Sequence, residues 1–144
     1  MSGVTSPVGY ADVVPGTELP AATYPVTRLS LVKYCGASGD FNVIHWNERV
    51  ARSVGLPDVI AHGMLTMAEA IRVVTDWAGD PGSVVQYGVR FTRPVVVPDE
   101  TGAAVEVSGR VTDKLEDGTV RVELTARSAE EKVLGQARAL VRLA

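Results

Sequence analysis

The segment GMLTMAEAIRVVTDWAG, residues 63–79, carries the strongest helical pattern of this sequence. Apolar residues recur three and four positions apart, which is the spacing of one face of an α-helix; this stripe comprises Met64, Met67, Ala68, Ile71, Val74 and Ala78. Leu65, Val73 and Trp77 widen the stripe until it covers much of the circumference. Such a helix has to be wrapped by other elements rather than lie on a surface, and Gly79 predicts where it ends.

Period-two alternation of apolar and polar residues, typical of β-strands, dominates the second half of the chain. It occurs at residues 85–91, 105–111, 120–124 and 133–143, with Asp117-Gly118 as a hairpin turn between the second and third segments. Residues 18–27 mix β-forming residues with two prolines, which indicates an edge strand. The apolar face of this sheet has to be buried, and the helix over 63–79 can cover it. The sequence therefore predicts an α+β fold, a curved antiparallel sheet wrapped around one central helix.

Two shorter helices are expected between the edge strand and the central helix. Thr27 or Ser30 can cap the first, and Gly39 is placed to end it in the left-handed conformation. The second is expected over NERVARSVG, from Asn47 to Gly55. Residues 39–47 between them are therefore expected to form a loop, and loops on rigid supports often carry functional residues.

Length, charge and cysteine content limit the class of protein. The 144 residues suit one domain over residues 1–144, and the aperiodic residues 1–15 are expected to be a loose N-terminal arm. A formal net charge of −3 without basic runs argues against a nucleic-acid partner. Cys35 is the only cysteine, which excludes an intramolecular disulfide and a multi-cysteine metal site.

Targeting and membrane signals are not apparent in the sequence. The stretch MSGVTSPVGYADVV has neither the basic nor the long apolar region of a secretory signal. Apolar stretches stay well short of the roughly 20 residues that cross a bilayer. We therefore expect a cytoplasmic protein with no membrane partner.

The stretch GDFNVIH places Asp40, Asn42 and His45 within six positions. An Asp–His pair can perform general acid–base catalysis. Asp40 and Asn42 can also be simple turn formers that bond to their own backbone, and His45 can be a half-buried ring satisfied by a carbonyl. His62 can be a capping or packing residue. The spacing of these histidines matches no zinc pattern, so we expect no metal and no cofactor.

A second feature gives the Asp–His interpretation more weight. Gly63 follows His62 at the start of the predicted central helix. A helix N-terminus offers unpaired backbone N–H groups and a positive dipole end, and glycine lets a ligand oxygen approach the main chain closely. These are the requirements of a site that stabilises an oxyanion.

Three stretches of the sequence resemble one known protein family. YCGASGDFNVIHWNERVA resembles the signature of the (R)-specific enoyl-thioester hydratases of the MaoC-like hotdog family, in which a Tyr, G-D-x-N-x-x-H and a later small residue recur in this order. AHGMLTM resembles the start of that family's central helix, and VRFTRPVVVPD resembles the strand after it. The chain looks closest to the β subunit of the actinobacterial (3R)-hydroxyacyl-thioester dehydratases. Val43 departs from the pattern, because the family usually has proline there, and the loop lacks that fixed φ.

This resemblance implies a hotdog fold, a homodimer or a heterodimer with a related hotdog subunit, and reversible hydration of trans-2-enoyl thioesters of CoA or acyl-carrier protein. By the same resemblance Asp40 and His45 activate one water and Asn42 orients the loop or the water. The Gly63 N–H then meets the enolate oxygen. The expected substrate-binding residues are His62, Met64, Met67, Arg90 and Arg93.

Two alternatives remain open from the sequence. One is an acyl-thioester hydrolase on the same fold, for which Glu69 is the candidate carboxylate on the central helix. The other is a subunit of a heteromeric dehydratase that is inactive alone.

Overall fold

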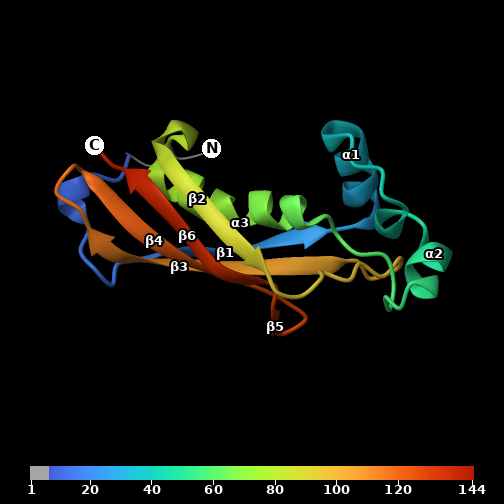
Figure 1. The fold of residues 1–144 in the computed structure, drawn as a ribbon. Coiled ribbons are helices and arrows are strands. Elements are labelled where there is room, and N and C mark those ends of the chain that lie inside the picture. The colour runs from blue at the N-terminus through green and yellow to red at the C-terminus, as the bar shows by residue number, and fades with distance from the viewer. Residues whose placement is uncertain (1–6) are drawn as a thin grey trace.

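A computed structural model describes residues 7–144 as one sheet, three α-helices and three short 3-10 helices (Figure 1). The helical elements are η1 (Tyr10–Asp12), α1 (Arg28–Ser38), η2 (Val43–His45), α2 (Glu48–Ser53), α3 (Gly63–Ala78) and η3 (Pro81–Ser83). The strands are β1 (Glu18–Val26), β2 (Val84–Phe91), β3 (Ala103–Lys114), β4 (Thr119–Ser128), β5 (Glu131–Lys132) and β6 (Leu134–Arg142).

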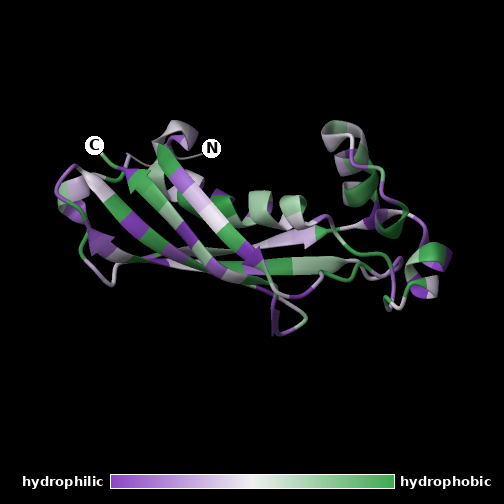
Figure 2. Ribbon diagram, viewed as in Figure 1, coloured by the Kyte–Doolittle hydropathy of each residue, from purple (hydrophilic) through white to green (hydrophobic). Residues whose placement is uncertain are grey.

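The strands form an antiparallel sheet in the order β1-β3-β4-β6-β2, with the short β5 paired to β4. The alternation of apolar and polar residues is visible along the strands in Figure 2. The apolar faces of β3, β4 and β6 are buried, as the sequence predicts. The prediction of an edge position is also confirmed for β1, and β2 lies at the opposite edge.

Helix α3 packs against β1, β2, β3 and β4, so that the sheet wraps around one side of it. Its ends were predicted correctly, because Gly79 adopts φ 79° directly after Ala78. The predicted buried stripe is only partly correct: Thr66, Ala70, Val73, Val74 and Ala78 are buried, whereas Met64 and Ala68 are exposed. Thr66, Ala70 and Ala78 are small, and small residues let a helix approach a sheet closely. Hydropathy alone cannot identify this face on a helix that is apolar around most of its circumference.

Residues 28–62 leave the sheet after β1 and return to it at α3, and α1 and α2 lie beyond the end of the sheet (Figure 1). Thr27 and Ser30 form a reciprocal capping box at the start of α1. Gly39 ends this helix with φ 77°, which is the predicted left-handed conformation. Asn47 caps α2 by accepting a hydrogen bond from the Val50 N–H.

The described part of the N-terminal segment differs from the loose arm that the sequence suggests. Val13 is only 1% exposed and packs into the core. The Tyr10 N–H donates to the Ala144 carbonyl over 2.7 Å, and the Gly16 N–H donates to the Val111 carbonyl over 2.7 Å. These contacts tie residues 10–16 to the sheet and to the C-terminal residue; residues 1–6 lie outside the described part.

Candidate active site

Asp40 and His45 come from the loop that joins α1 to α2. Asp40 follows the left-handed Gly39, and its Oδ1 accepts a hydrogen bond from the Asn42 N–H over 3.1 Å. The Asn42 side chain accepts from the Ile44 N–H over 3.2 Å and so caps the short helix η2. The turn-forming interpretation of Asp40 and Asn42 is therefore correct for these bonds, and they leave Asp40 Oδ2 available.

His45 points its ring from the end of η2 toward Asp40. Its side chain is 8% exposed, and its Nε2 lies 3.9 Å from Asp40 Oδ2. Its Nδ1 lies 2.7 Å from the Ile60 carbonyl oxygen, which can only accept a hydrogen bond. Nδ1 therefore carries a hydrogen, and in the neutral ring Nε2 presents its lone pair to Asp40.

The 3.9 Å separation between Asp40 Oδ2 and His45 Nε2 is too long for a direct hydrogen bond. It leaves room for one water that lies about 2.8 Å from both atoms. The Asp40 side chain is 54% exposed, so solvent reaches this position from outside. The two groups converge on one point in space, as an acid–base pair requires.

His62 lies behind this pair and is 2% exposed. Its ring stacks on the His45 ring, with centroids 3.8 Å apart and planes inclined by 21°. Its Nε2 lies 3.1 Å from the Asp40 carbonyl oxygen and 3.6 Å from Cys35 Sγ. Tyr34 contacts the same ring edge-on at 4.7 Å. These contacts of His62 are all to the protein, and the substrate contact that the sequence suggests for it stays a prediction.

Burial shifts the pKa values of His62 and of its neighbour Cys35. Burial lowers the pKa of His62 below its ordinary value of 6.5, and the nearby His45 lowers it further, although the hydrogen bond to the Asp40 carbonyl opposes this shift. Burial also raises the pKa of the Cys35 thiol, and the Asp40 carboxylate adds to that rise. His62 and Cys35 are therefore neutral at pH 7.

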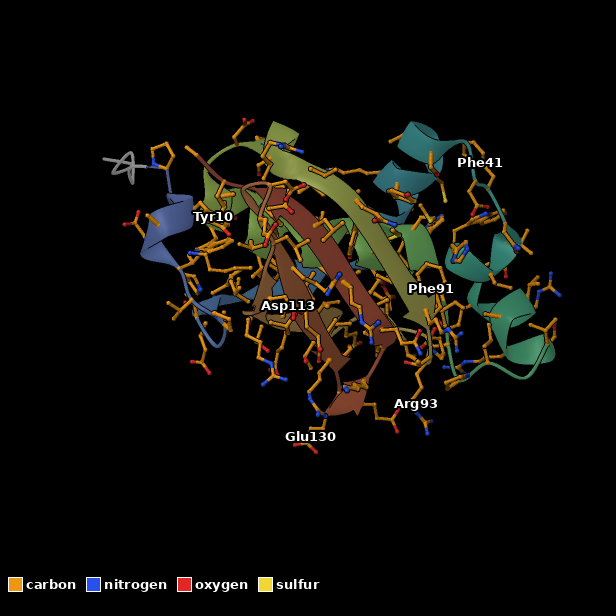
Figure 3. The ribbon with its side chains drawn as sticks, turned by 60° about the vertical axis from the view of Figure 1, so that its left-hand side comes forward. Tyr10, Phe41, Phe91, Arg93, Asp113 and Glu130 are labelled. Carbon is orange, nitrogen blue, oxygen red and sulfur yellow. The ribbon has the colours of Figure 1, made fainter. Side chains whose placement is uncertain are left out.

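Gly63 is the first residue of α3, where backbone N–H groups lack partners within the helix. It lines a hollow of about 350 Å³ together with Ile60, Thr66, Phe91, Arg93 and Val95, among others. Phe91 lies at the end of β2 nearest to the segment that carries α1 and α2 (Figure 3). The hollow thus brings a helix N-terminus, an aromatic ring and a cationic side chain together.

The remaining predicted substrate-binding residues lie in different environments. Arg93 lines the hollow of Gly63 and also lies 3.7 Å from Glu131. Met64 is 57% exposed, and Met67 is partly buried with its carbonyl accepting from the Tyr87 hydroxyl. Arg90 instead lines a separate hollow with Arg121 and Arg138 on the polar face of the sheet. Arg90 is therefore not brought together with the other predicted residues.

Three side chains offer atoms close enough to suggest a metal site. One ligand atom each from Asp40, His45 and His62 lies within 4.8 Å of the others. Their geometry does not suit a metal, because a ligated ion has to lie close to the plane of each imidazole ring. The stacked rings of His45 and His62 occupy nearly parallel planes, which do not meet within a metal–nitrogen bond length of about 2.1 Å. The arrangement fits a bridging water better than an ion.

Two elements of the site have no signal in the sequence. The Ile60 carbonyl fixes the His45 tautomer by accepting a hydrogen bond from Nδ1. Every residue has a backbone carbonyl, so a sequence motif does not indicate which one will bind the ring. The Phe91 ring lies against Gly63 from β2, which is distant in sequence, although its place in the strand pattern was predicted. Both depend on how the segments pack together.

A curved antiparallel sheet wrapped around one long helix defines a hotdog-fold protein. Residues 12–128 match the family model described as MaoC like domain. The chain belongs to the MaoC-like domain family, as the sequence motif indicates.

Relatives and solved structures agree with this membership. The chain is 31% identical over 106 residues to the (R)-specific enoyl-CoA hydratase of Rhodospirillum rubrum, and the match covers 73% of each chain. It is 38% identical over 86 residues to the 3-hydroxyacyl-thioester dehydratase X of Mycobacterium tuberculosis, covering 60% of this chain and 30% of that protein. A solved MaoC-like dehydratase is 40% identical with a TM-score of 0.93, covering 96% of this chain and 43% of that one. The chain thus spans less than half the length of the last two proteins.

Along the described residues 7–144, the helices are too short or too polar to cross a membrane.

Proposed function

We propose that this protein hydrates trans-2-enoyl thioesters to (3R)-hydroxyacyl thioesters and catalyses the reverse dehydration. The thiol component is CoA or an acyl-carrier protein. The observation that carries this proposal is the convergence of Asp40 Oδ2 and His45 Nε2, 3.9 Å apart. The names of the two curated relatives, a hydratase and a dehydratase, support the same chemistry.

The Asp40–His45 pair suits the activation of one water. An ionised carboxylate and the Nε2 lone pair are both acceptors, so each takes one hydrogen bond from the water. The lone pairs of the water oxygen then face outward toward Cβ of the enoyl group. As the new C–O bond forms at Cβ, one proton passes from the water to the pair, and the pair returns one proton to Cα. Dehydration follows the same path in reverse.

The N-terminus of α3 suits the charge that develops on the thioester oxygen. Attack at Cβ moves an electron pair toward the carbonyl, and the Gly63 N–H can donate to the resulting enolate oxygen. One such donor is worth about 2.7 to 4 kcal/mol of transition-state stabilisation. In this proposal Met64 and Met67 lie along the acyl chain, Arg93 lies near the phosphates of the carrier, and Asn42 holds the loop that presents Asp40.

A second hotdog subunit is part of this proposal. Within residues 7–144, strand β2 pairs with β6 on one side only, and it lies at an edge of the sheet. Val85 on this strand is 54% exposed, and exposed apolar edge strands are sites where another chain can pair. At the other end of β2, Phe91 is 54% exposed and lies against the Gly63 position of α3, so exposed apolar side chains occur at both ends of this strand. We propose that β2 pairs with the same strand of an identical or a related subunit.

Hydration of a short trans-2-enoyl-CoA, followed by the loss of enoyl-thioester absorbance, tests the activity directly. We expect Asp40→Asn and His45→Ala each to lower kcat/KM by at least about 10²-fold. Asp99→Asn is the matched control, because it makes the same exchange at an exposed carboxylate of the loop after β2. Activity retained in either Asp40→Asn or His45→Ala, with unchanged stability, would falsify the acid–base assignment.

The hydrolase alternative receives less support from its candidate residue. Glu69 Oε2 lies 2.7 Å from Arg72 Nη1 on the same helix, α3. The carboxylate that hydrolysis would need is therefore already engaged in an ion pair. Incubation with a saturated acyl-CoA, with free thiol measured, separates the two activities. Thiol release without any hydration of enoyl-CoA would favour hydrolysis.

A further inference from the structure

His62 contributes no atom to the reacting water in the mechanism above, yet it is the most deeply buried polar side chain of the site. It contacts both members of the acid–base pair from behind. Its Nε2 lies 3.1 Å from the backbone oxygen of Asp40, and its ring stacks on the ring of His45. The same side chain thus touches both residues that have to converge.

The direction of the Asp40 contact can be assigned. A carbonyl oxygen only accepts, so His62 Nε2 has to carry the hydrogen. Its Nδ1 is buried and has no hydrogen-bond partner among the described residues. A hydrogen on Nδ1 would be an unsatisfied buried donor, which is costly. The ring is therefore held as the neutral tautomer with its hydrogen on Nε2.

We propose that His62 is a positioning residue, whose Nε2–H fixes the Asp40 backbone so that the Asp40 carboxylate and the His45 ring meet on one water. This role rests on the proposed function. The exposed turn that carries Asp40 is held locally by Ser38 and Asn42, through bonds to neighbours in sequence. The bond from His62 spans 22 positions and connects this turn to the start of α3. It therefore sets the position of Asp40 relative to Gly63 as well as to His45.

The first test observes His62 without any substrate. The chain has only two histidines, so nitrogen–proton NMR correlations of the imidazole rings contain two spin systems, and His62→Gln leaves one. We expect His62 to hold its hydrogen on Nε2 throughout pH 6 to 8 and His45 to hold its hydrogen on Nδ1 when neutral. A His62 ring protonated on Nδ1, or one that exchanges between tautomers, overturns the proposal. This result does not depend on which reaction the protein catalyses.

The second test compares two variants of His62. Glutamine can place an amide N–H near the position of Nε2, whereas leucine fills the space without a donor. We expect His62→Leu to lower kcat about 10- to 100-fold, because small displacements of reacting groups cost that much. His62→Gln should retain most of kcat, and KM should change little in both variants. The pH profile of kcat should shift in His62→Leu only, since the spacing of the pair changes.

Cys35→Ala supplies the matched control, because Sγ is the other atom near His62 Nε2. We expect this variant to keep the wild-type kcat and tautomer. Equal losses in the leucine and glutamine variants, or a change confined to KM, overturn the positioning role. Such a result leaves the proposed function intact if Asp40→Asn still lowers kcat/KM for hydration at least about 10²-fold; if wild-type protein shows no hydration, the proposed function fails and the NMR test alone decides the tautomer of His62.

Discussion

The Phe91 ring lies against Gly63 so closely that a Cβ atom added at Gly63 would come within 3.1 Å of two ring carbons. Phe91 is 54% exposed, so its ring has room to yield toward solvent. Any side chain at Gly63 would nevertheless project into the hollow that both residues line. The absence of a side chain at Gly63 therefore keeps the helix N-terminus accessible.

We expect Gly63→Ala to lower hydration at least about tenfold, because the methyl group obstructs the donor that stabilises the enolate. Stability should change by less than about 1 kcal/mol, since the gain in helix propensity offsets the tight contact with Phe91. Steady-state kinetics and urea unfolding measure the two effects. Gly36→Ala is the control, because Gly36 lies in α1 with open space around its Cβ position. Full activity in Gly63→Ala would remove the helix terminus from the mechanism.

His62 should also make stability depend on pH. Its pKa is lowered in the folded protein, so below about pH 6.5 the unfolded chain binds a proton that the folded chain does not. The unfolding free energy contributed by His62 is therefore complete above pH 6.5 and falls as the pH decreases, until the folded-state pKa is passed. Urea unfolding of wild type and His62→Gln at pH 7.5 and 5.5 measures the difference. A wild-type decrease no larger than that of His62→Gln contradicts this expectation.

Arg28 should matter for stability more than its neighbouring cations. Its guanidinium bonds to Asp58, Glu48 and the Val97 carbonyl, and so joins the start of α1 to α2 and to the segment after β2. The Asp58 side chain is 13% exposed, and removing its partner leaves a nearly buried carboxylate. We expect Arg28→Met to cost about 2 kcal/mol in urea unfolding.

The control for Arg28 is Arg52→Met, since Arg52 pairs with the same two carboxylates from a side chain that is 59% exposed. Exposed pairs contribute about 0 to 1 kcal/mol. Equal losses in the two variants would show that burial does not distinguish them.

The proposed pairing of β2 predicts that Val85→Asp lowers the molar mass in light scattering to that of one chain, because a charge on a paired edge is costly. Val14→Asp is the control: Val14 is 63% exposed and precedes β1 at the opposite edge of the sheet. We expect this control to leave the mass unchanged. An unchanged mass in Val85→Asp would place the subunit contact elsewhere.

Local patterns predicted the elements of this fold because their signals lie in neighbouring residues. Alternation located the strands, and glycines with positive φ, such as Gly39 and Gly79, marked helix ends. The face of α3 that meets the sheet was harder to predict, because it is distinguished by small residues such as Ala70 rather than by high hydropathy. The anchored N-terminal segment was missed for a related reason: Val13 is buried by contacts with distant strands.

The candidate site was predictable in its residue types and less so in its spatial relations. The motif brought Asp40 and His45 together because both belong to one turn of chain. It could not reveal that His62 faces the protein or that Arg90 lies on the polar face of the sheet, since both depend on the packing of separate segments. The spacing of residues in a sequence predicts contacts within one turn of the chain, but it does not predict contacts between distant segments.

The excursion of residues 28–62 contains Asp40, His45, the Ile60 carbonyl and His62, while the sheet and α3 contribute the surface on which it rests. Its two ends are the close of β1 and the opening of α3. One contiguous stretch therefore holds all four of these groups, so exchanging residues 28–62 between related scaffolds should transfer Asp40, His45 and His62 together, while the sheet and α3 stay with the recipient.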